Sequence, residues 1–210
     1  SNGIYQVLDA SLDTTYLVDC NDFEKVILRQ YHDSSRRTAH QAPELRIKRE
    51  LAVLDATQDS DLFSNYLGRG ISSIIVVQGQ WGPSVFDTFY KKTPSTEEVA
   101  ELGGDLCTSL QYLHERGIIL RNADRRTIIK GDTWRFSSLD TARISGLFEH
   151  EDPRDVYGTP AFSPPEQIHG SPFEPRSDVY SLGALLYWVV VGSDSFRGSP
   201  PSGLDIYDEI

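Results

Sequence analysis

Residues 114–140 hold the side chains of this 210-residue chain whose types and spacing come nearest to a catalytic centre. An apolar pair leads into a polar loop that contains Asn122, Asp124 and Thr127. A second apolar pair, a turn and a strand-like run follow, and that run ends near Ser138. Amide, carboxylate and hydroxyl groups on two successive loops can move protons and bind metal or phosphate, so these loops are the first candidates for chemistry.

Short runs rich in β-branched and aromatic residues predict a sheet in the first part of the chain. They occupy residues 4–8, 14–18, 25–29, 62–67 and 71–77. A helix that begins at Pro43 and carries Glu50 is inserted between the third and fourth runs. The glycines and proline of 78–83 mark a linker after the fifth run.

Helical periodicity takes over beyond the linker. Ser95 and Glu98 form a capping-box pattern, and leucines then trace one face as far as His114. The adjacent residues Gly103 and Gly104 inside this helix indicate close packing against a neighbour. An almost wholly apolar helix is expected over 178–191. The pattern predicts an α+β fold with two lobes, 3–79 and 80–196, and a flexible tail over 197–210.

Composition narrows the classes of partner and compartment. The formal charge of −11 argues against nucleic acid, because binding to its backbone needs clustered Lys and Arg. No apolar run has the roughly 18 residues of a membrane span, and no leader precedes the first strand. The distant pair Cys20 and Cys107 is expected to be two free, buried thiols in a reducing, cytoplasmic setting. The five histidines show no metal-ligand spacing.

Three motifs resemble those of the protein kinase family. Residues 158–166 are similar to the end of a kinase activation segment, residues 178–183 to its Asp-x-Trp-Ser-x-Gly helix, and 49–51 to the helix that carries the partner of the active-site lysine. The resemblance implies a bilobal fold with a five-stranded antiparallel N-lobe sheet, one N-lobe helix and a mainly helical C-lobe. It also implies structural roles for Arg121, Glu166 and Asp178.

The same resemblance implies where the catalytic groups would stand, and most have been replaced. Arg29 takes the place of the lysine on the third strand, and Asn122 that of the catalytic aspartate. Asp124 stands where a lysine is common. Thr127 and Ser138 occupy the positions of the two metal ligands, which in the family are carboxylate and amide groups.

Two further points concern the nucleotide site. The loop at 9–13 lacks the glycines that would let backbone amides approach phosphate. An alternative register places Asp140, instead of Ser138, at the position of the metal-binding aspartate. The degenerate nucleotide pocket would be lined by Arg29, Glu50, Val77, Gly79, Thr127 and Ser138.

These replacements predict a pseudokinase that acts as an interaction scaffold or allosteric partner, without phosphotransfer, without Mg-ATP binding and with no cofactor or metal. The alternatives are an atypical enzyme that uses displaced groups such as Asp124 or Asp140, and a module that binds nucleotide without metal. Residues 138–140 are similar to the tribbles pseudokinases, and 158–196 to kinase-like domains of giant muscle scaffold proteins.

The expected partners are proteins, namely a signalling enzyme or its substrate. The C-lobe is expected to be truncated, so that the face at 185–191 would be covered by a partner, a second copy of the chain or the tail.

Overall fold

A five-stranded sheet forms the N-terminal part of the computed structural model, which describes residues 4–10, 13–20, 23–31, 43–69, 74–78, 82–147, 159–168 and 172–192. Its strands are β1 (Ile4–Ala10), β2 (Asp13–Cys20), β3 (Phe23–Tyr31), β4 (Asn65–Arg69) and β5 (Ile74–Gln78). Every neighbouring pair is antiparallel, and the strand order is β1-β2-β3-β5-β4. The centre of the sheet is therefore β3, the strand that carries Arg29.

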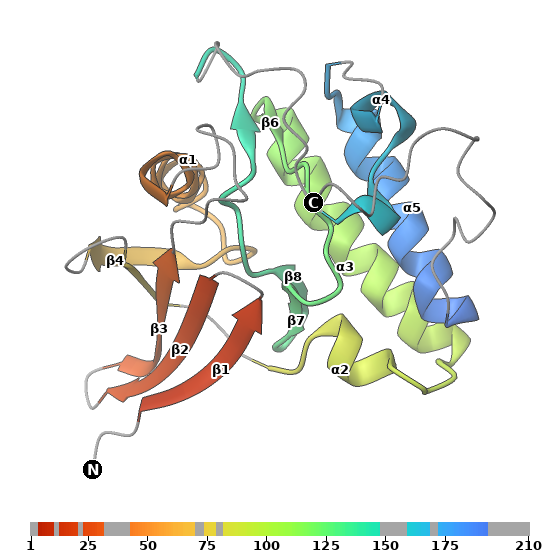
Figure 1. Cartoon of the computed structure of the whole chain (residues 1–210), viewed down its shortest axis with the longest axis horizontal. Helices are drawn as coiled ribbons and strands as arrows, with labels where there is room; N and C mark the ends of the chain where they lie inside the picture. The colour runs from red at the N-terminus through yellow and green to blue at the C-terminus, as the bar shows by residue number, and fades with distance from the viewer. Residues whose placement is uncertain are drawn as a thin grey trace.

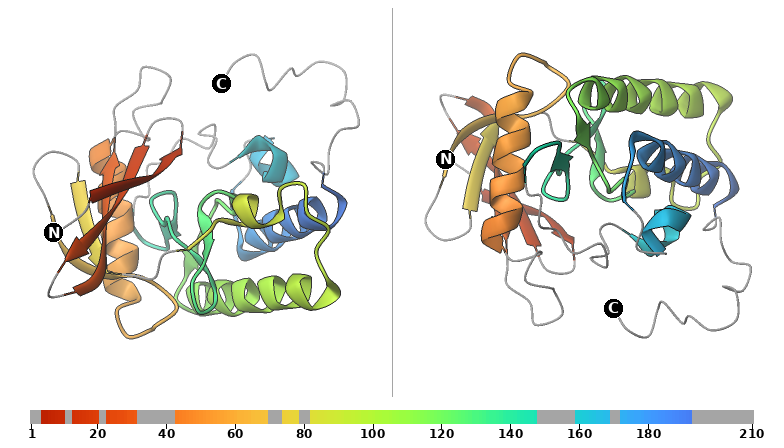
Figure 2. Two further views of the ribbon diagram at one scale, coloured as in Figure 1. Left: turned by 90° about the horizontal axis from the view of Figure 1, so that it is seen from below. Right: turned by 90° about the horizontal axis from the view of Figure 1, so that it is seen from above.

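Helix α1 (Pro43–Ala56) lies beside the sheet, on the side that faces the rest of the protein (Figure 1, Figure 2). Its inner face buries Ile47, Val53 and Leu54 together with charged residues. The mixture is unusual, because charged side chains are rarely buried unless they are paired. Helix α1 thus supplies both packing and charge to the region between the sheet and the helices.

Two helices, α3 (Thr96–Glu115) and α5 (Pro175–Val191), form the frame of the C-terminal part and lie side by side in both views of Figure 2. The capping box predicted at Ser95 and Glu98 is confirmed by reciprocal hydrogen bonds of 3.2 and 2.9 Å. A Cβ added at Gly103 would lie 3.4 Å from the Leu186 side chain, which bears out the close packing expected there. A Cβ added at Gly104 would have no such neighbour within 4 Å, so the close packing expected at that residue is wrong.

Short elements complete the part of the chain that follows the sheet (Figure 1). They are α2 (Val85–Phe89), β6 (Ile118–Ile119), β7 (Ile128–Lys130), β8 (Trp134–Phe136), β9 (Arg143–Ile144), the 3-10 helix η2 (Pro160–Phe162) and α4 (Pro165–Ile168). Strand β6 pairs with β9, and β7 pairs with β8. The predicted α+β class is confirmed.

Several boundaries differ from those expected. Strand β4 starts at Asn65, because Phe63 is buried against the Tyr112 ring from a turn and not from a strand. Helix α5 starts at Pro175, whose fixed φ suits the first turn of a helix.

Other expectations concern single residues and termini. The thiol of Cys107 is exposed, so the prediction that it is buried is wrong. Gly79 and the tail at 197–210 lie outside the described residues. Within the described ranges, no helix is long and apolar enough to cross a membrane.

Candidate functional site

The loop after β6 is held by one buried carboxylate. Asp178, on α5, accepts hydrogen bonds of 2.8 Å from the backbone N–H groups of Leu120 and Arg121. Its Oδ2 also lies 2.8 Å from Nε2 of His114 at the end of α3. Because Asp178 is only 2% exposed, these bonds are shielded from water, and the loop is fixed to both long helices.

Arg121 has a φ of +66°, in the left-handed region that non-glycine residues seldom adopt. Its Nε donates a hydrogen bond of 2.6 Å to the carbonyl oxygen of Thr141, and its guanidinium lies over the Phe173 ring at 5.9 Å. The strained backbone persists because surrounding contacts fix it, as is common at functional sites. The contacts of Arg121 therefore fix the direction of the loop that follows it.

Asp124 is the carboxylate that this loop presents. Its Oδ2 accepts a hydrogen bond from the hydroxyl of Thr159, which belongs to the segment just before η2. Its Oδ1 accepts a 2.6 Å hydrogen bond from the backbone N–H of Arg126. An ionised carboxylate has about four acceptor positions, so roughly two remain for another donor. Asp124 thus joins two segments and keeps capacity for a further hydroxyl.

Asn122 is partly buried, and its Oδ1 has no hydrogen-bond partner among the described residues. Thr127 directly precedes β7, and its hydroxyl donates to the Asp124 carbonyl oxygen at 3.2 Å. The side chains predicted for this loop are thus gathered in one place, with Asp124 as their charged member.

A buried group of charges joins β3, α1 and the segment after β8. Arg29 forms an ion pair with Glu50, and the Tyr31 hydroxyl donates to the same carboxylate. Arg46, one helical turn before Glu50, pairs with Asp140, and its Nε lies 2.6 Å from Asp140 Oδ2. We call these five residues the charge network; all are less than 9% exposed.

The network contains two cations and two carboxylates, so its formal charges balance. Burial lowers the pKa of Arg29 to about 10, and Arg29 is therefore still a cation at neutral pH. Burial alone would raise the pKa of Asp140, but Arg46, the hydroxyl of Ser138 and Arg29 together hold that pKa below its ordinary value. Asp140 is accordingly ionised in the folded protein.

The two predicted metal positions, Thr127 and Ser138, do not fit a divalent cation. The Ser138 hydroxyl donates to Asp140 Oδ1 at 2.6 Å, and Asp140 itself is paired with Arg46. A hydroxyl is a poor ligand for Mg²⁺, which prefers charged oxygen. No group of three His, Cys, Asp or Glu side chains in the described part of the chain could hold a metal ion.

The remaining predicted residues lie in supporting positions. Val77, on β5, is fully buried in the hydrophobic core and pairs with Ile27 of β3. Glu166, on α4, accepts a hydrogen bond of 2.5 Å from the Ser177 hydroxyl of α5. Glu166 thus links α4 to the start of α5.

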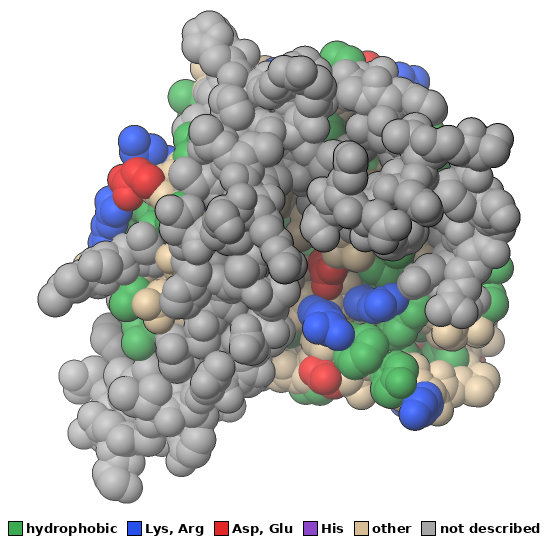
Figure 3. Space-filling view, viewed as in Figure 1, with side chains coloured by type: hydrophobic (Ala, Val, Ile, Leu, Met, Phe, Trp, Pro, Cys, Tyr) green, Lys and Arg blue, Asp and Glu red, His purple; other side chains and the backbone are tan. Residues whose placement is uncertain are grey.

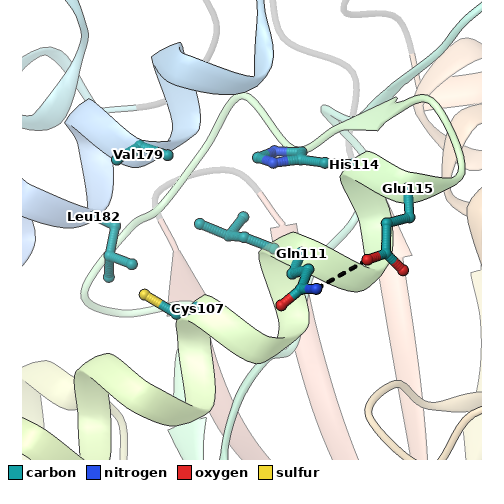
Figure 4. Close-up of a pocket in the computed structure, with 7 residues that line it drawn as sticks. Cys107, Gln111, His114, Glu115, Val179 and Leu182 are labelled. Carbon is teal, nitrogen blue, oxygen red and sulfur yellow. Dashed lines mark hydrogen bonds between the residues drawn. The ribbon is translucent and has the colours of Figure 1, made fainter.

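A separate hollow of about 460 Å³ lies between α3 and α5 (Figure 4). The side chains that line it include Cys107, Gln111 and Val179, and Gln111 is tied to Glu115 by a 2.9 Å hydrogen bond. Asn122, Asp124 and the charge network take no part in it. The hollow is therefore distinct from the predicted site.

Comparison with known proteins identifies the class to which this fold and site belong. The sequence model of the protein kinase domain matches residues 24–208, which is most of the chain. The chain belongs to the protein kinase family.

Three relatives illustrate the similarity. The chain is 28% identical to a probable serine/threonine-protein kinase of Corynebacterium efficiens over 81% of its own length and 26% of the relative's. It is 31% identical to the serine/threonine-protein kinase PknB of Mycobacterium tuberculosis over 60% and 21% of the two lengths. It is 24% identical to a probable myosin light chain kinase of Dictyostelium discoideum over 85% and 36%. The chain thus spans about a quarter of the length of its bacterial relatives.

These comparisons correct the functional expectation. A scaffold without phosphotransfer, and a chain that is not an enzyme, were expected from the replaced residues, but the relatives are named as protein kinases and point to catalytic function. The expectation gave full weight to the residue type at each family position. Asp124, a carboxylate two residues beyond Asn122, was given a role only in the alternative of an atypical enzyme.

The sequence interpretation also missed three residues that the structure brings into the site. Arg46 and Tyr31 belong to the charge network, and Thr159 bonds to Asp124. Asp140 was considered as a metal ligand and as a displaced catalytic group, but not as the partner of Arg46. The spacing of Arg46 and Glu50, four residues apart on one helix, was a signal that both side chains face the same way.

Proposed function

We propose that this chain is part of a protein kinase that transfers the γ-phosphoryl group of ATP to Ser or Thr hydroxyls of proteins, with Asp124 as the proton acceptor. The names of the relatives support the reaction class. The single observation that supports the role of Asp124 is its hydrogen bond with Thr159, because a threonine hydroxyl already fits against this carboxylate. A substrate hydroxyl would make the same kind of contact.

The proposed chemical step involves only the two substrates and side chains of this chain, since the described residues do not fit a metal ion. The substrate hydroxyl oxygen bonds to the γ-phosphorus, and the bond from that phosphorus to the bridging oxygen of ADP breaks. The hydroxyl proton passes to the Asp124 carboxylate, and ADP leaves with the bridging oxygen. A positioned base of this kind contributes typically about a hundredfold to ten-thousandfold in rate.

Arg29 is assigned to the phosphate side of the site. The guanidinium is held by Glu50 and stays charged at neutral pH, as binding to phosphate oxygens requires. The backbone strain at Arg121 and the bonds to Asp178 fix the loop that carries Asp124. In this assignment residues 3–79 form the lobe on the ATP side, and 80–196 form the lobe that holds the protein substrate.

The test is transfer of label from γ-labelled ATP to a mixed pool of Ser and Thr peptides, with Asp124→Asn as the variant. Asn keeps the size of the side chain but accepts no proton. We expect the rate to fall by about a hundredfold or more. Asp55→Asn is the matched control, because Asp55 is an exposed carboxylate on α1.

Two results would contradict the proposal at separate points. Absence of incorporation by the unaltered chain would exclude phosphoryl transfer. Equal rates for Asp124→Asn and Asp55→Asn would exclude Asp124 as the base. The cytoplasmic location and a protein that covers the face at 185–191 stay predictions from the sequence.

A further inference from the structure

Three aromatic rings form a stack next to the loop that carries Asp124. Phe86 on α2 stacks on Tyr90, with ring centroids 4.7 Å apart, and on Trp188 of α5, with centroids 6.0 Å apart. Tyr90 is 52% exposed, Phe86 is partly buried, and Trp188 is only 6% exposed. We call these three rings the aromatic shelf. Its exposed ring, Tyr90, rests on Phe86 and is therefore a rigid contact surface that loses little conformational entropy on binding.

Cations lie over each ring of the aromatic shelf. The guanidinium of Arg125 is 4.7 Å from the centroid of Trp188, and that of Arg126 is 5.0 Å from the centroid of Phe86. The Lys91 ammonium is 5.0 Å from the Tyr90 ring. The face of an aromatic ring attracts a cation placed over it, so each contact holds the charged group in position. Figure 3 shows Lys and Arg side chains beside hydrophobic ones on this face, with Asp or Glu side chains next to them.

The shelf is tied directly to the candidate catalytic loop. The backbone N–H of Phe86 donates to the carbonyl oxygen of Arg125 at 2.9 Å. The backbone N–H of Arg126 donates to Asp124 at 2.6 Å. A peptide whose hydroxyl reached Asp124 would therefore extend its neighbouring residues over the cations.

Around the shelf the three cations Arg125, Arg126 and Lys91 outnumber the neighbouring carboxylates Asp87 and Asp124, whereas the chain as a whole carries a formal charge of −11. The exposed carboxylate of Asp87 on α2 is engaged by the hydroxyl and backbone N–H of Ser84, at 2.7 and 3.1 Å. Arg126 and Lys91 are both exposed. This small basic surface on an acidic protein would attract anions and repel cationic peptides.

We propose that the aromatic shelf and its cations bind an acidic segment of the protein substrate next to the phosphorylated hydroxyl. This inference rests on the proposed kinase function and adds the substrate class to it. Arg recognises carboxylates through paired N–H donors, and the exposed Tyr90 ring supplies apolar contact for the peptide. A protein segment fits better than nucleic acid, because three cations are few for a phosphate backbone and the rest of the chain is acidic.

The test measures binding of three fluorescent twelve-residue peptides to the full 210-residue chain by anisotropy. Each peptide has one central Ser, flanked by Asp and Glu, by Gln, or by Lys and Arg. We expect the acidic peptide to bind about tenfold more tightly than the Gln peptide and to lose that advantage at high salt. Arg126→Glu and Lys91→Glu should each remove about tenfold, because an attraction becomes a repulsion.

Lys48→Glu and Arg176→Glu are the matched controls, because both are exposed cations, on α1 and α5. They should leave the binding of the acidic peptide unchanged. Circular dichroism of each variant verifies that the exposed substitutions keep the fold.

Label transfer to the same peptides separates the two proposals. Tight, Arg126-dependent binding of the acidic peptide without label transfer would support the shelf and overturn the kinase function. Equal binding of all three peptides, or equal loss in the control variants, would overturn the shelf even if transfer occurs. Tighter binding of a single-stranded oligonucleotide than of the acidic peptide would also overturn it.

Discussion

Replacement of Arg46 by Met should expose the role of the charge network most clearly. Arg46 is buried, and its guanidinium pairs with Asp140, a residue 94 positions further along the chain. The pair connects α1 to the segment after β8, so its loss affects how the sheet and the helical part are joined. Met has an unbranched stem that fills similar space without charge.

The size of the effect follows from burial. Removal of one partner from a buried ion pair costs about 3–5 kcal/mol, because the other charge is left without compensation. Asp140 retains the hydroxyl of Ser138 and the nearby charge of Arg29, so the lower end, about 3 kcal/mol, is expected. For a domain of about this length, 1 kcal/mol corresponds to about 2–4 °C in Tm, and the shift should be about 6–12 °C.

Thermal unfolding followed by circular dichroism measures this shift. Arg69→Met is the matched control, since Arg69 joins β4 to Glu44 of α1 at 2.7 Å with both side chains largely exposed. Its Tm should stay close to that of the unaltered protein, because exposed pairs are screened by water. The double variant Arg46→Met with Asp140→Val should recover part of the loss. Equal shifts for Arg46→Met and Arg69→Met would refute the reasoning.

Three further predictions concern stability. The folded pKa of Asp140 lies below its ordinary value of about 4. The stabilisation that ionised Asp140 provides is therefore complete above that ordinary value and is lost as the pH falls through the lowered pKa. Asp140→Asn should make the unfolding free energy depend less on pH in this acid range. A Cβ at Gly82 would meet the Lys130 carbonyl oxygen at 1.6 Å, so Gly82→Ala should cost about 3 kcal/mol in urea unfolding, whereas Gly104→Ala, with open space around it on α3, should gain about 1 kcal/mol. Asp178→Asn should cost about 1–3 kcal/mol and speed hydrogen exchange at the two N–H groups that Asp178 holds, because one accepting oxygen is lost. The first prediction is contradicted if Asp140→Asn and the unaltered protein show the same pH dependence of unfolding. The second is contradicted if the two glycine variants have equal unfolding free energies in urea, and the third if exchange at the two N–H groups stays slow in Asp178→Asn.

The parts of the fold that could be predicted depend on local signals. Alternating β-branched residues located β1 to β3, and the Ser95 capping box located the start of α3. Helix α2 was missed because it has five residues, although Ser84 and Asp87 have the spacing of a capping box and form one. The false start of β4 came from Phe63, a core residue that is buried from a turn.

The candidate site was less accessible to sequence reasoning because its contacts are long-range. The resemblance to protein kinases placed Arg29 and Glu50 at the positions of a paired lysine and its partner, and the structure joins them. They gave no sign that Arg46 would meet Asp140, or that Phe86 would stack on Trp188, because these partners are about a hundred residues apart. Such contacts are set by the packing of whole elements, which a periodic pattern does not encode.

Transfer of label from γ-labelled ATP to a Ser peptide by the unaltered chain and by Asp124→Asn is the most direct test of the central claim. Time-dependent incorporation that falls by about a hundredfold or more in Asp124→Asn, and stays unchanged in Asp55→Asn, is the predicted result. No incorporation by the unaltered chain, or the same rate in all three proteins, would contradict it.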